Sequence, residues 1–167
     1  FSEESAQVAS VSGPRVLANQ DAEDVQTLFC GELSVDGVQV VSGVAAPLAG
    51  RVGLVQQDPE TQVVLGRIGD DVAFGAENLG VEPDHIWERV RSALDRVGLG
   101  EFPLNHATSA LSGGQKQRLA VAGLLAMRPG VWLLDEPTAN LDPEGAAQVR
   151  DVVLSAAREA GATVLLV

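Results

Sequence analysis

The sequence predicts an α/β fold in which a parallel sheet carries an inserted helical lobe. Two continuous apolar runs of strand length occupy residues 131–134 and 162–167, and strands that are apolar on both faces are typical of a parallel sheet covered on both sides. Between them, Asp142 and Pro143 form a helix N-cap and a first-turn proline, and Gly161 ends the helix. A length of 167 residues is enough for one such domain with a small lobe inside it.

The amino-terminal third of the chain contains weaker signals. Residues 8–12 alternate in polarity like a short strand, and residues 21–29 fit one or two helical turns. Residues 31–37 are expected to form a strand that ends in an Asp-Gly turn. Residues 51–55 are a further short apolar run, which ends at a polar Gln-Gln-Asp-Pro segment.

The middle of the chain, residues 60–125, is mainly helical in pattern and is expected to form the inserted lobe. Residues 83–97 place their apolar side chains on one face of a helix. The positions on that face are Ile86, Val90, Ala93, Leu94 and Val97. Residues 119–127 are apolar almost all round, so this helix is expected to be buried.

The composition argues against several classes of partner. The formal net charge of −12 repels phosphate backbones and anionic lipid headgroups. Four Phe, two Trp and no Tyr leave few rings on which nucleic acid bases stack. No apolar run reaches the ~18 residues that a membrane helix needs. We therefore expect no nucleic acid partner and no direct membrane insertion.

The single cysteine and the first residues bear on the cellular setting. Cys30 has no second cysteine to pair with in the sequence, so it is expected to be an inert thiol in a reducing compartment. The chain begins with an acidic stretch that lacks the basic and apolar regions of a signal peptide. Because it also lacks an initiator Met, we expect it to begin inside a longer chain.

One segment has the composition of an anion-binding site. Leu-Ser-Gly-Gly-Gln at residues 111–115 leads straight into the buried helix. Two glycines at a helix start let backbone N–H groups approach an anion, and the helix dipole favours negative charge there. The hydroxyl of Ser112 adds a donor. Taken alone, an ordinary loop that caps a helix explains these residues equally well.

A second segment has the composition of a metal and proton-transfer site. Asp135 and Glu136 follow the strand at residues 131–134, and the carboxyl ends of parallel strands are where α/β sheets bind ligands. Asp135 suits a Mg²⁺ ion held through oxygen, and Glu136 is placed to accept a proton from an attacking water. The competing explanation is that the strand simply ends in acids because it reaches solvent there. Asp142, a few residues later, is likewise explained by a plain helix N-cap.

Three motifs follow one another in this order: the Leu-Ser-Gly-Gly-Gln segment, then the strand that ends in Asp-Glu, and then Asn-Leu-Asp at residues 140–142. Together they resemble the ATP-binding-cassette (ABC) family over roughly residues 31–167. The resemblance implies a P-loop NTPase-like α/β core with a parallel sheet and an inserted helical subdomain. It also implies ATP and Mg²⁺ as cofactors. The implied reaction is ATP hydrolysis at the interface of two subunits, by in-line attack of water on the γ-phosphate.

The resemblance assigns roles to individual residues. Gln57 would be the Q-loop glutamine, which contacts Mg²⁺ and the attacking water. Asp135 would be the Walker B metal ligand, Glu136 the catalytic base, and Asp142 a D-loop residue at the dimer interface. The signature loop, which binds the γ-phosphate of ATP held by the partner subunit, would consist of Ser112, Gly113, Gly114 and Gln115.

A narrower resemblance covers residues 52–62, with the sequence VGLVQQDPETQ, and residues 70–80, with the sequence DDVAFGAENLG. Both are similar to the ATPases of energy-coupling-factor (ECF) importers, which take up vitamins and metal ions such as cobalt. The resemblance implies a second ABC ATPase subunit and a transmembrane partner at the cytoplasmic face of the cell membrane. Because the segment after the Q-loop lies near the groove for coupling helices in that family, residues 60–82 are expected to contact the transmembrane partner.

The sequence departs from the family where the phosphate-binding loop Gly-x-x-x-x-Gly-Lys-[Ser/Thr] is expected, before Gly31. The only lysine is Lys116, inside the signature helix. If the Gly-Pro pair at residues 13–14 is a remnant of that loop, residues 18–20 place Ala, Asn and Gln where its second glycine, lysine and hydroxyl residue belong. The resemblance is therefore strong after Gly31 and lacks its phosphate-binding loop before Gly31.

Three segments are expected. Residues 1–60 would be the amino-terminal part of the ATPase core, with the phosphate loop absent or degenerate. Residues 61–125 would be the helical subdomain with the signature loop, and residues 126–167 the carboxyl-terminal part of the core, truncated before the family's switch histidine. His85 and His106 come too early for that histidine and are expected at the surface or in a loop.

Two explanations of the missing loop stay open. Either residues are absent from this chain, which is then a fragment, or the loop is degenerate and the subunit is a non-catalytic partner. We favour the first, because Gln57, Asp135 and Glu136 would otherwise have no phosphate to act on. A DNA-repair type of ABC ATPase is a weaker alternative, since the stretch from Gln57 to Leu111 is too short for the long coiled-coil insertion of those proteins.

We expect the 167-residue chain to bind ATP weakly and not to hydrolyse it on its own. Without a lysine loop it lacks the backbone cradle and the cation that hold the β- and γ-phosphates. Calorimetric titration of the purified chain with ATP and Mg²⁺ measures this directly. Micromolar affinity in this chain would show that the phosphates are held by other residues.

Overall fold

The computed structural model describes residues 9–12, 32–35, 38–39 and 49–166 of the chain. The chain divides into two compact units, Phe1–Ala49 and Gly50–Val167, and each is described by itself. The residues proposed for the functional site all belong to the second unit.

The first unit contains a small antiparallel sheet in the order β1-β2-β3. Its strands are β1 (Ala9–Ser12), β2 (Glu32–Val35) and β3 (Val38–Gln39). The strands expected within residues 8–12 and 31–37 are therefore present. The helical turns expected over residues 21–29 and the Gly-Pro pair at residues 13–14 lie outside the described residues.

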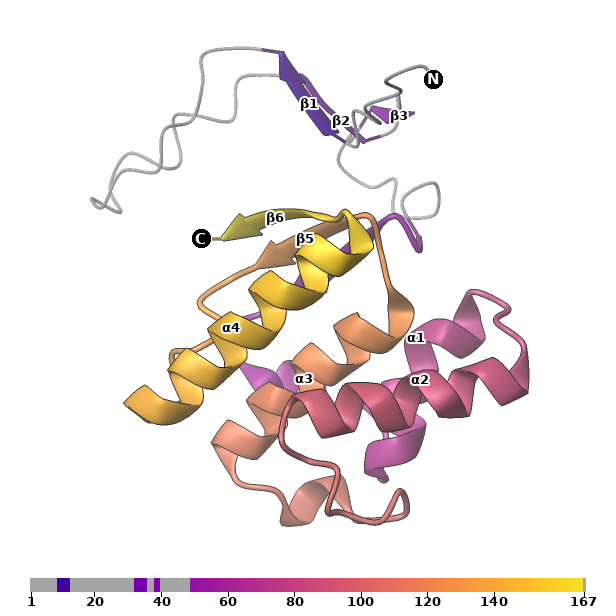
Figure 1. Ribbon diagram of the computed structural model, residues 1–167, viewed down its shortest axis with the longest axis vertical. Coiled ribbons are helices and arrows are strands. Elements are labelled where there is room, and N and C mark those ends of the chain that lie inside the picture. Colours follow the sequence, from indigo (N-terminus) through magenta and orange to yellow (C-terminus); the bar gives the residue numbers. More distant parts are fainter. Residues whose placement is uncertain (1–8, 13–31, 36–37, 40–48, 167) are drawn as a thin grey trace. The chain divides into compact units, whose positions relative to one another are not determined.

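The second unit is built on a parallel sheet in the order β4-β5-β6 (Figure 1). Its strands are β4 (Val52–Val55), β5 (Val131–Leu134) and β6 (Thr163–Leu166). The predicted parallel sheet is confirmed, and the strands closely match the apolar runs of the sequence. In register, Leu54 lies beside Leu133, and Leu133 lies beside Leu165.

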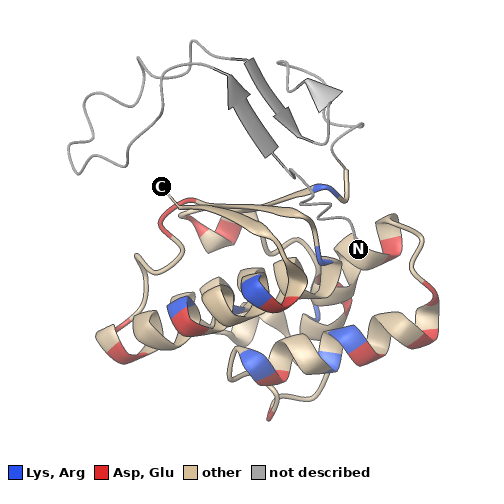
Figure 2. Ribbon diagram, turned by 45° about the horizontal axis from the view of Figure 1, so that its top comes forward, with Lys and Arg blue, Asp and Glu red and all other residues tan. Residues whose placement is uncertain are grey.

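Helices occupy most of the remaining described residues of the second unit. They are the 3-10 turn η3 (Pro59–Thr61), α1 (Ile68–Asn78), α2 (Pro83–Arg96), the 3-10 turn η4 (Thr108–Ala110), α3 (Gly113–Met127) and α4 (Pro143–Ala160). Helices α1, α2 and α3 pack against one another and form a helical lobe where the sequence predicts one. The boundaries of that lobe at residues 61 and 125 stay a prediction. Basic and acidic residues alternate along the long helices, so neither α2 nor α4 presents a face of one sign (Figure 2).

Side-chain caps fix the two helices that begin beside the candidate site. At the start of α3, the Ser112 hydroxyl accepts a hydrogen bond from the Gln115 N–H at 3.3 Å, and the Gln115 amide oxygen accepts one from the Ser112 N–H at 2.8 Å. This reciprocal pair is a capping box. At the start of α4, Asp142 accepts from the Gly145 N–H at 3.2 Å, and Gly161 ends the helix with a φ of 63°.

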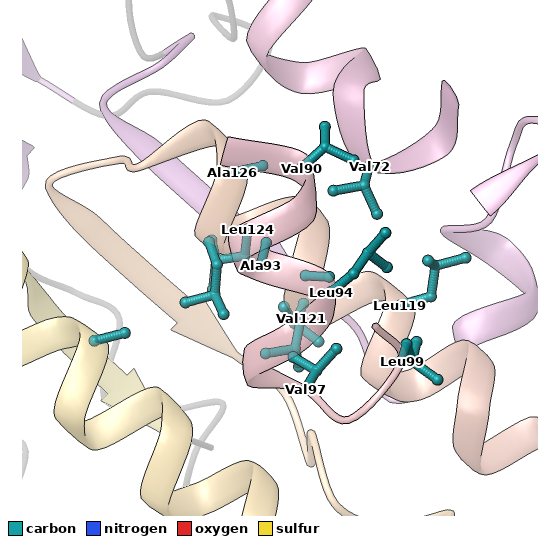
Figure 3. Packing of buried hydrophobic residues seen from close by; sticks show 14 of the residues in the cluster. Val72, Val90, Ala93, Leu94, Val97, Leu99, Leu119, Val121, Leu124 and Ala126 are labelled. Carbon is teal, nitrogen blue, oxygen red and sulfur yellow. The ribbon is translucent and has the colours of Figure 1, made fainter. Parts of the chain in front are cut away.

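A single hydrophobic cluster joins the helices to the sheet (Figure 3). The apolar face predicted for residues 83–97 is buried in it, against Leu119 and Val121 of α3. From the sheet, the cluster takes Val55, Trp132 and Leu134, all at most 1% exposed. The Trp132 ring N–H donates to the carbonyl of Pro129 at 2.7 Å, so this large side chain is buried without an unpaired polar atom.

Within the described part of the second unit, the sheet is covered on one face only, where the sequence predicts cover on both. The helices of this unit all lie on the same side of the sheet (Figure 1). On the opposite face, Leu54 and Leu165 are 47% and 42% exposed, and Leu133 between them is half-buried. Strands β4 and β5 therefore have one buried face and one more open face, because no helix described in this unit crosses to the second side, whereas both Leu165 and Leu166 of β6 are exposed.

The close packing of α3 on the sheet depends on Gly53 in β4. A Cβ atom at this position would overlap Leu124 Cδ1 and would lie 2.7 Å from Pro129 Cγ. The absence of a side chain therefore lets α3 approach β4 directly. This approach sets the distance between the lobe and the strand that leads into the candidate site.

We expect Gly53→Ala to destabilise the chain by about 1–3 kcal/mol, the range found for overpacked cores. The matched control is Gly123→Ala, because Gly123 lies inside α3 and a methyl group there would meet no atom within 4 Å. That change should stabilise by about 0.5–1 kcal/mol through helix propensity. Urea unfolding midpoints of the two variants measure the effects. Equal midpoints would show that α3 does not rest tightly on β4.

Candidate functional site

The site forms where β4 and β5 end at the same edge of the sheet. Their parallel pairing continues past the last strand residue, because the Asp135 N–H donates to the Val55 carbonyl at 2.8 Å. Gln57 follows β4 by two residues, and Glu136 follows Asp135 directly. Residues that are far apart in sequence therefore meet at one strand edge, as the parallel topology requires.

Gln57 and Glu136 are in direct contact. The Gln57 amide nitrogen donates a hydrogen bond of 2.6 Å to a carboxylate oxygen of Glu136. Both side chains are exposed, so the contact lies at the surface of the unit and within reach of a ligand. A hydrogen bond to an ionised carboxylate is stronger than one between neutral groups, and it fixes the direction in which the carboxylate points.

The backbone of Glu136 is left-handed, with a φ of 41°. This conformation is uncommon outside glycine and costs a non-glycine residue on the order of 1–3 kcal/mol. The chain turns back there, with the Ala139 N–H donating to the Glu136 carbonyl at 3.0 Å. The strained residue is one that the sequence singles out for proton transfer, which is where such strain tends to be retained.

Asn140 is a site residue that the sequence reasoning did not select. Its side-chain amide donates to the backbone carbonyl of Gln57 at 3.1 Å, so it ties the segment after β5 to the segment after β4. In the sequence it appears only as the first residue of the Asn-Leu-Asp motif at residues 140–142, with no role of its own. Asp142 itself caps α4, as its simpler interpretation predicts, and its role at a dimer interface stays a proposal.

Residues 112–115, expected to form the signature loop, lie against the same segment. A Cβ atom on Gly114 would lie 3.1 Å from Leu141 Cδ2 and 3.5 Å from the Asn140 carbonyl oxygen. Gly114 therefore allows the start of α3 to touch the loop that contains Asn140. Ser112 and Gly113 are exposed. Ser112 therefore caps α3 and is at the same time accessible from solvent. The loop is thus capped internally while its outer side stays accessible.

The oxygen groups of the site fit a metal ion that is bound together with a phosphate. Among the described residues, no group of three or more His, Cys, Asp or Glu side chains forms a metal cage. Mg²⁺ in nucleotide sites is held by one or two carboxylates with phosphate oxygens and waters. The exposed Asp135 carboxylate and the nearby Gln57 amide oxygen match that donor set.

Asp71 differs from the other acids of the segment expected to meet a transmembrane partner. Its carboxylate accepts hydrogen bonds from the N–H groups of Val64 and Leu65, at 2.9 and 2.8 Å. Burial raises the pKa of the Asp71 carboxyl above its ordinary value, and the hydrogen bonds from Leu65 and Val64 partly oppose this. Asp71 therefore holds the turn before α1 in place, while Asp70 and Glu77 remain exposed.

Within the described ranges, no helix combines the length and the apolar character that crossing a membrane requires.

Comparison with known proteins supports the family resemblance. Residues 22–139 match the protein family described as ABC transporter. The energy-coupling factor transporter ATP-binding protein EcfA1 of Clostridium perfringens is 50% identical over 117 residues, which are 70% of this chain and 41% of that protein. The protein of the same name from Latilactobacillus sakei is 40% identical over 138 residues, 83% of this chain and 49% of that protein. The chain thus spans less than half the length of these curated relatives.

Two solved structures share the fold. One is cbiO1 of Clostridium perfringens, part of the ABC transporter complex cbiONQ, with a TM-score of 0.69 and 36% identity over 83% of this chain and 55% of that one. The other is the ATP-binding cassette MJ0796 in a dimeric post-hydrolysis state bound to ADP and Pi, with a TM-score of 0.70 and 26% identity over 81% and 61%. The predicted P-loop NTPase-like α/β core is confirmed, and the chain belongs to the ABC transporter family.

Proposed function

We propose that the chain is the ATP-binding and hydrolysing part of an ABC importer subunit of the ECF kind. The observation that carries this proposal is the hydrogen bond between Gln57 and Glu136 where β4 and β5 end. It brings an amide that orients water and metal next to a carboxylate that accepts a proton, which is what hydrolysis of ATP needs. The likeness to proteins named as ECF ATP-binding subunits supports the same function.

The proposed reaction uses ATP and Mg²⁺. Mg²⁺, when bound with the nucleotide, neutralises the charge that develops on the phosphates. Asp135 and Gln57 would hold the metal through oxygen, while Glu136 accepts the proton of the attacking water. The signature loop, residues 112–115, would contact the γ-phosphate of ATP held by a second ABC ATPase subunit. Asp142 would lie where the two subunits meet.

The subunit would drive uptake of a vitamin or metal ion through a transmembrane partner, at the cytoplasmic inner face of the cell membrane. The exposed face of α1 and the turn before it support docking there. Val64 and Phe74 are 60% and 45% exposed, and Phe74 lies on one helix face with the exposed acids Asp70 and Glu77. Apolar residues rimmed by acids suit a partner helix that presents apolar and basic side chains.

A non-catalytic partner subunit is the second candidate, and the lack of a recognisable phosphate-loop lysine in the sequence favours it. The one lysine, Lys116, belongs to α3 and forms an ion pair with Glu60. A subunit of this kind would still present its signature loop to the ATP of an active partner.

In a version of the chain supplied with a complete phosphate loop, Glu136→Gln should lower ATP turnover by roughly 10²-fold or more, as loss of a general base does. The variant keeps the shape of the side chain, so it should still bind ATP. Asp135→Asn removes a negative ligand from Mg²⁺ and should weaken the binding of both metal and nucleotide. Gel filtration with ATP and Mg²⁺ separates the two effects.

The Glu136 variant should accumulate as an ATP-bound dimer, and the Asp135 variant should stay monomeric. If Glu136→Gln hydrolyses ATP at the parent rate, Glu136 is not the base and the proposed mechanism fails. If the parent itself shows no ATP turnover, the proposed hydrolytic function fails.

Reversing the charge of Asp70 and Glu77 together should weaken co-purification with the transmembrane partner. We leave Asp71 unchanged, because it accepts two backbone hydrogen bonds within its own turn. The matched control reverses Glu88 and Asp151, two exposed acids in α2 and α4, which gives the same change of net charge. Equal recovery of the complex from both double variants would place the partner elsewhere.

A further inference from the structure

We propose that Lys116 is a positioning residue, which links the signature loop to Gln57 through an ion pair with Glu60. The inference rests on the proposed function, since it assigns a regulation to the proposed ATP site. In this arrangement, a change at the signature loop displaces Gln57 relative to Glu136. Nucleotide held by one subunit would thereby affect the catalytic carboxylate of the other.

The first step of the link lies inside α3. The Lys116 N–H donates to the carbonyl of Ser112 at 2.9 Å, so the lysine backbone is bonded to the signature loop itself. Its side chain leaves the helix and pairs with the carboxylate of Glu60 in η3. The Lys116 side chain is only 14% exposed, whereas that of Glu60 is 64% exposed. The lysine is thus held in one direction by its surroundings.

The second step is the closed loop formed by residues 56–62. The Gln62 amide oxygen accepts from the Gln56 N–H at 2.8 Å, and the Gln62 amide nitrogen donates to the Leu54 carbonyl at 2.8 Å. The Thr61 hydroxyl donates to the Gln56 side-chain oxygen at 2.8 Å. These bonds cross the loop from both sides of Gln57. A force on Glu60 therefore acts on a loop that moves as one piece.

The third step is a buried contact beneath the loop. Gln117 is fully buried, and its amide nitrogen donates to the backbone carbonyl of Gln56 at 3.4 Å. Among the residues that the structure describes, its amide oxygen has no hydrogen-bond partner. Through its amide nitrogen, Gln117 adds a second side-chain tie between α3 and the loop, beside the ion pair of Lys116 with Glu60.

The last step is the contact already described. Gln57 is the next residue after Gln56, and its side chain donates to Glu136 at 2.6 Å. The path from Ser112 to Glu136 therefore runs through Lys116, Glu60 and Gln57. Each connection along it is a hydrogen bond, an ion pair or a short stretch of the backbone within one closed loop.

The size of the effect follows from the exposure of the pair. A partly exposed ion pair contributes about 0.2–1 kcal/mol, so breaking it should change the coupled property by no more than about fivefold. The exposed position of Glu60 also means that its variants should fold normally. Exchanging the two charges, with Lys116→Glu and Glu60→Lys combined, tests the pair directly. This exchange restores the ion pair without restoring either original residue.

The first experiment uses the chain itself and follows hydrogen exchange by mass spectrometry. Glu60→Gln should raise exchange up to about fivefold in residues 56–62 and also in residues 112–116. The matched control, Glu159→Gln, removes the Arg96–Glu159 ion pair between α2 and α4 and should leave both segments unchanged. Faster exchange in residues 56–62 alone would give Glu60 a local role and overturn the proposal.

The second experiment measures ATP turnover of the dimer in a version with a complete phosphate loop. Lys116→Glu and Glu60→Lys should each lower kcat by up to about fivefold with KM for ATP little changed. The double swap should return kcat to within about twofold of the parent. Single variants with parental kcat, or a swap that restores nothing, would overturn the link. A parent without turnover contradicts the proposed function, and the exchange experiment then decides the link by itself.

Discussion

The parallel pairing of β4 with β5 is the constraint on which the rest of the site depends. These two short strands are separated by the whole helical lobe in sequence, yet their hydrogen bonds continue to Asp135 and bring both carboxyl ends to one edge. The contact of Gln57 with Glu136 and that of Asn140 with the Gln57 carbonyl both follow from this alignment. A shift of one residue in the register would turn Gly53 and Val55 away from α3 and open the core.

Local patterns predicted the elements well because each has its cause in a few neighbouring residues. The apolar runs became β5 and β6, and the Asp-Pro start and the glycine stop became the ends of α4. The ABC motifs selected Gln57 and Glu136, and the structure brings these two residues into contact, while their roles stay proposals. Helix α1 was expected only as part of a helical region, because its apolar positions are interrupted by glycines and acids.

The remaining features depend on contacts that no local pattern contains. The ion pair of Lys116 with Glu60 joins residues from two separate elements, and nothing in either neighbourhood indicates it. Asp71 looks like one more exposed acid until the turn before α1 folds over it. The open face of the sheet also depends on parts of the chain that are distant in sequence. The apolar strands predict cover on both sides, but they do not say which part of a chain provides it.

The left-handed backbone of Glu136 has a consequence for how this position can change. Every residue with a Cβ atom bears a cost at a φ of 41°, and Glu136 already bears it. Glu136→Ala would therefore remove the carboxylate and leave the backbone cost about the same, whereas Glu136→Gly would remove the carboxylate and relieve that cost. The stability that the glycine variant gains over the alanine variant then measures what the chain gives up to hold a carboxylate at this place.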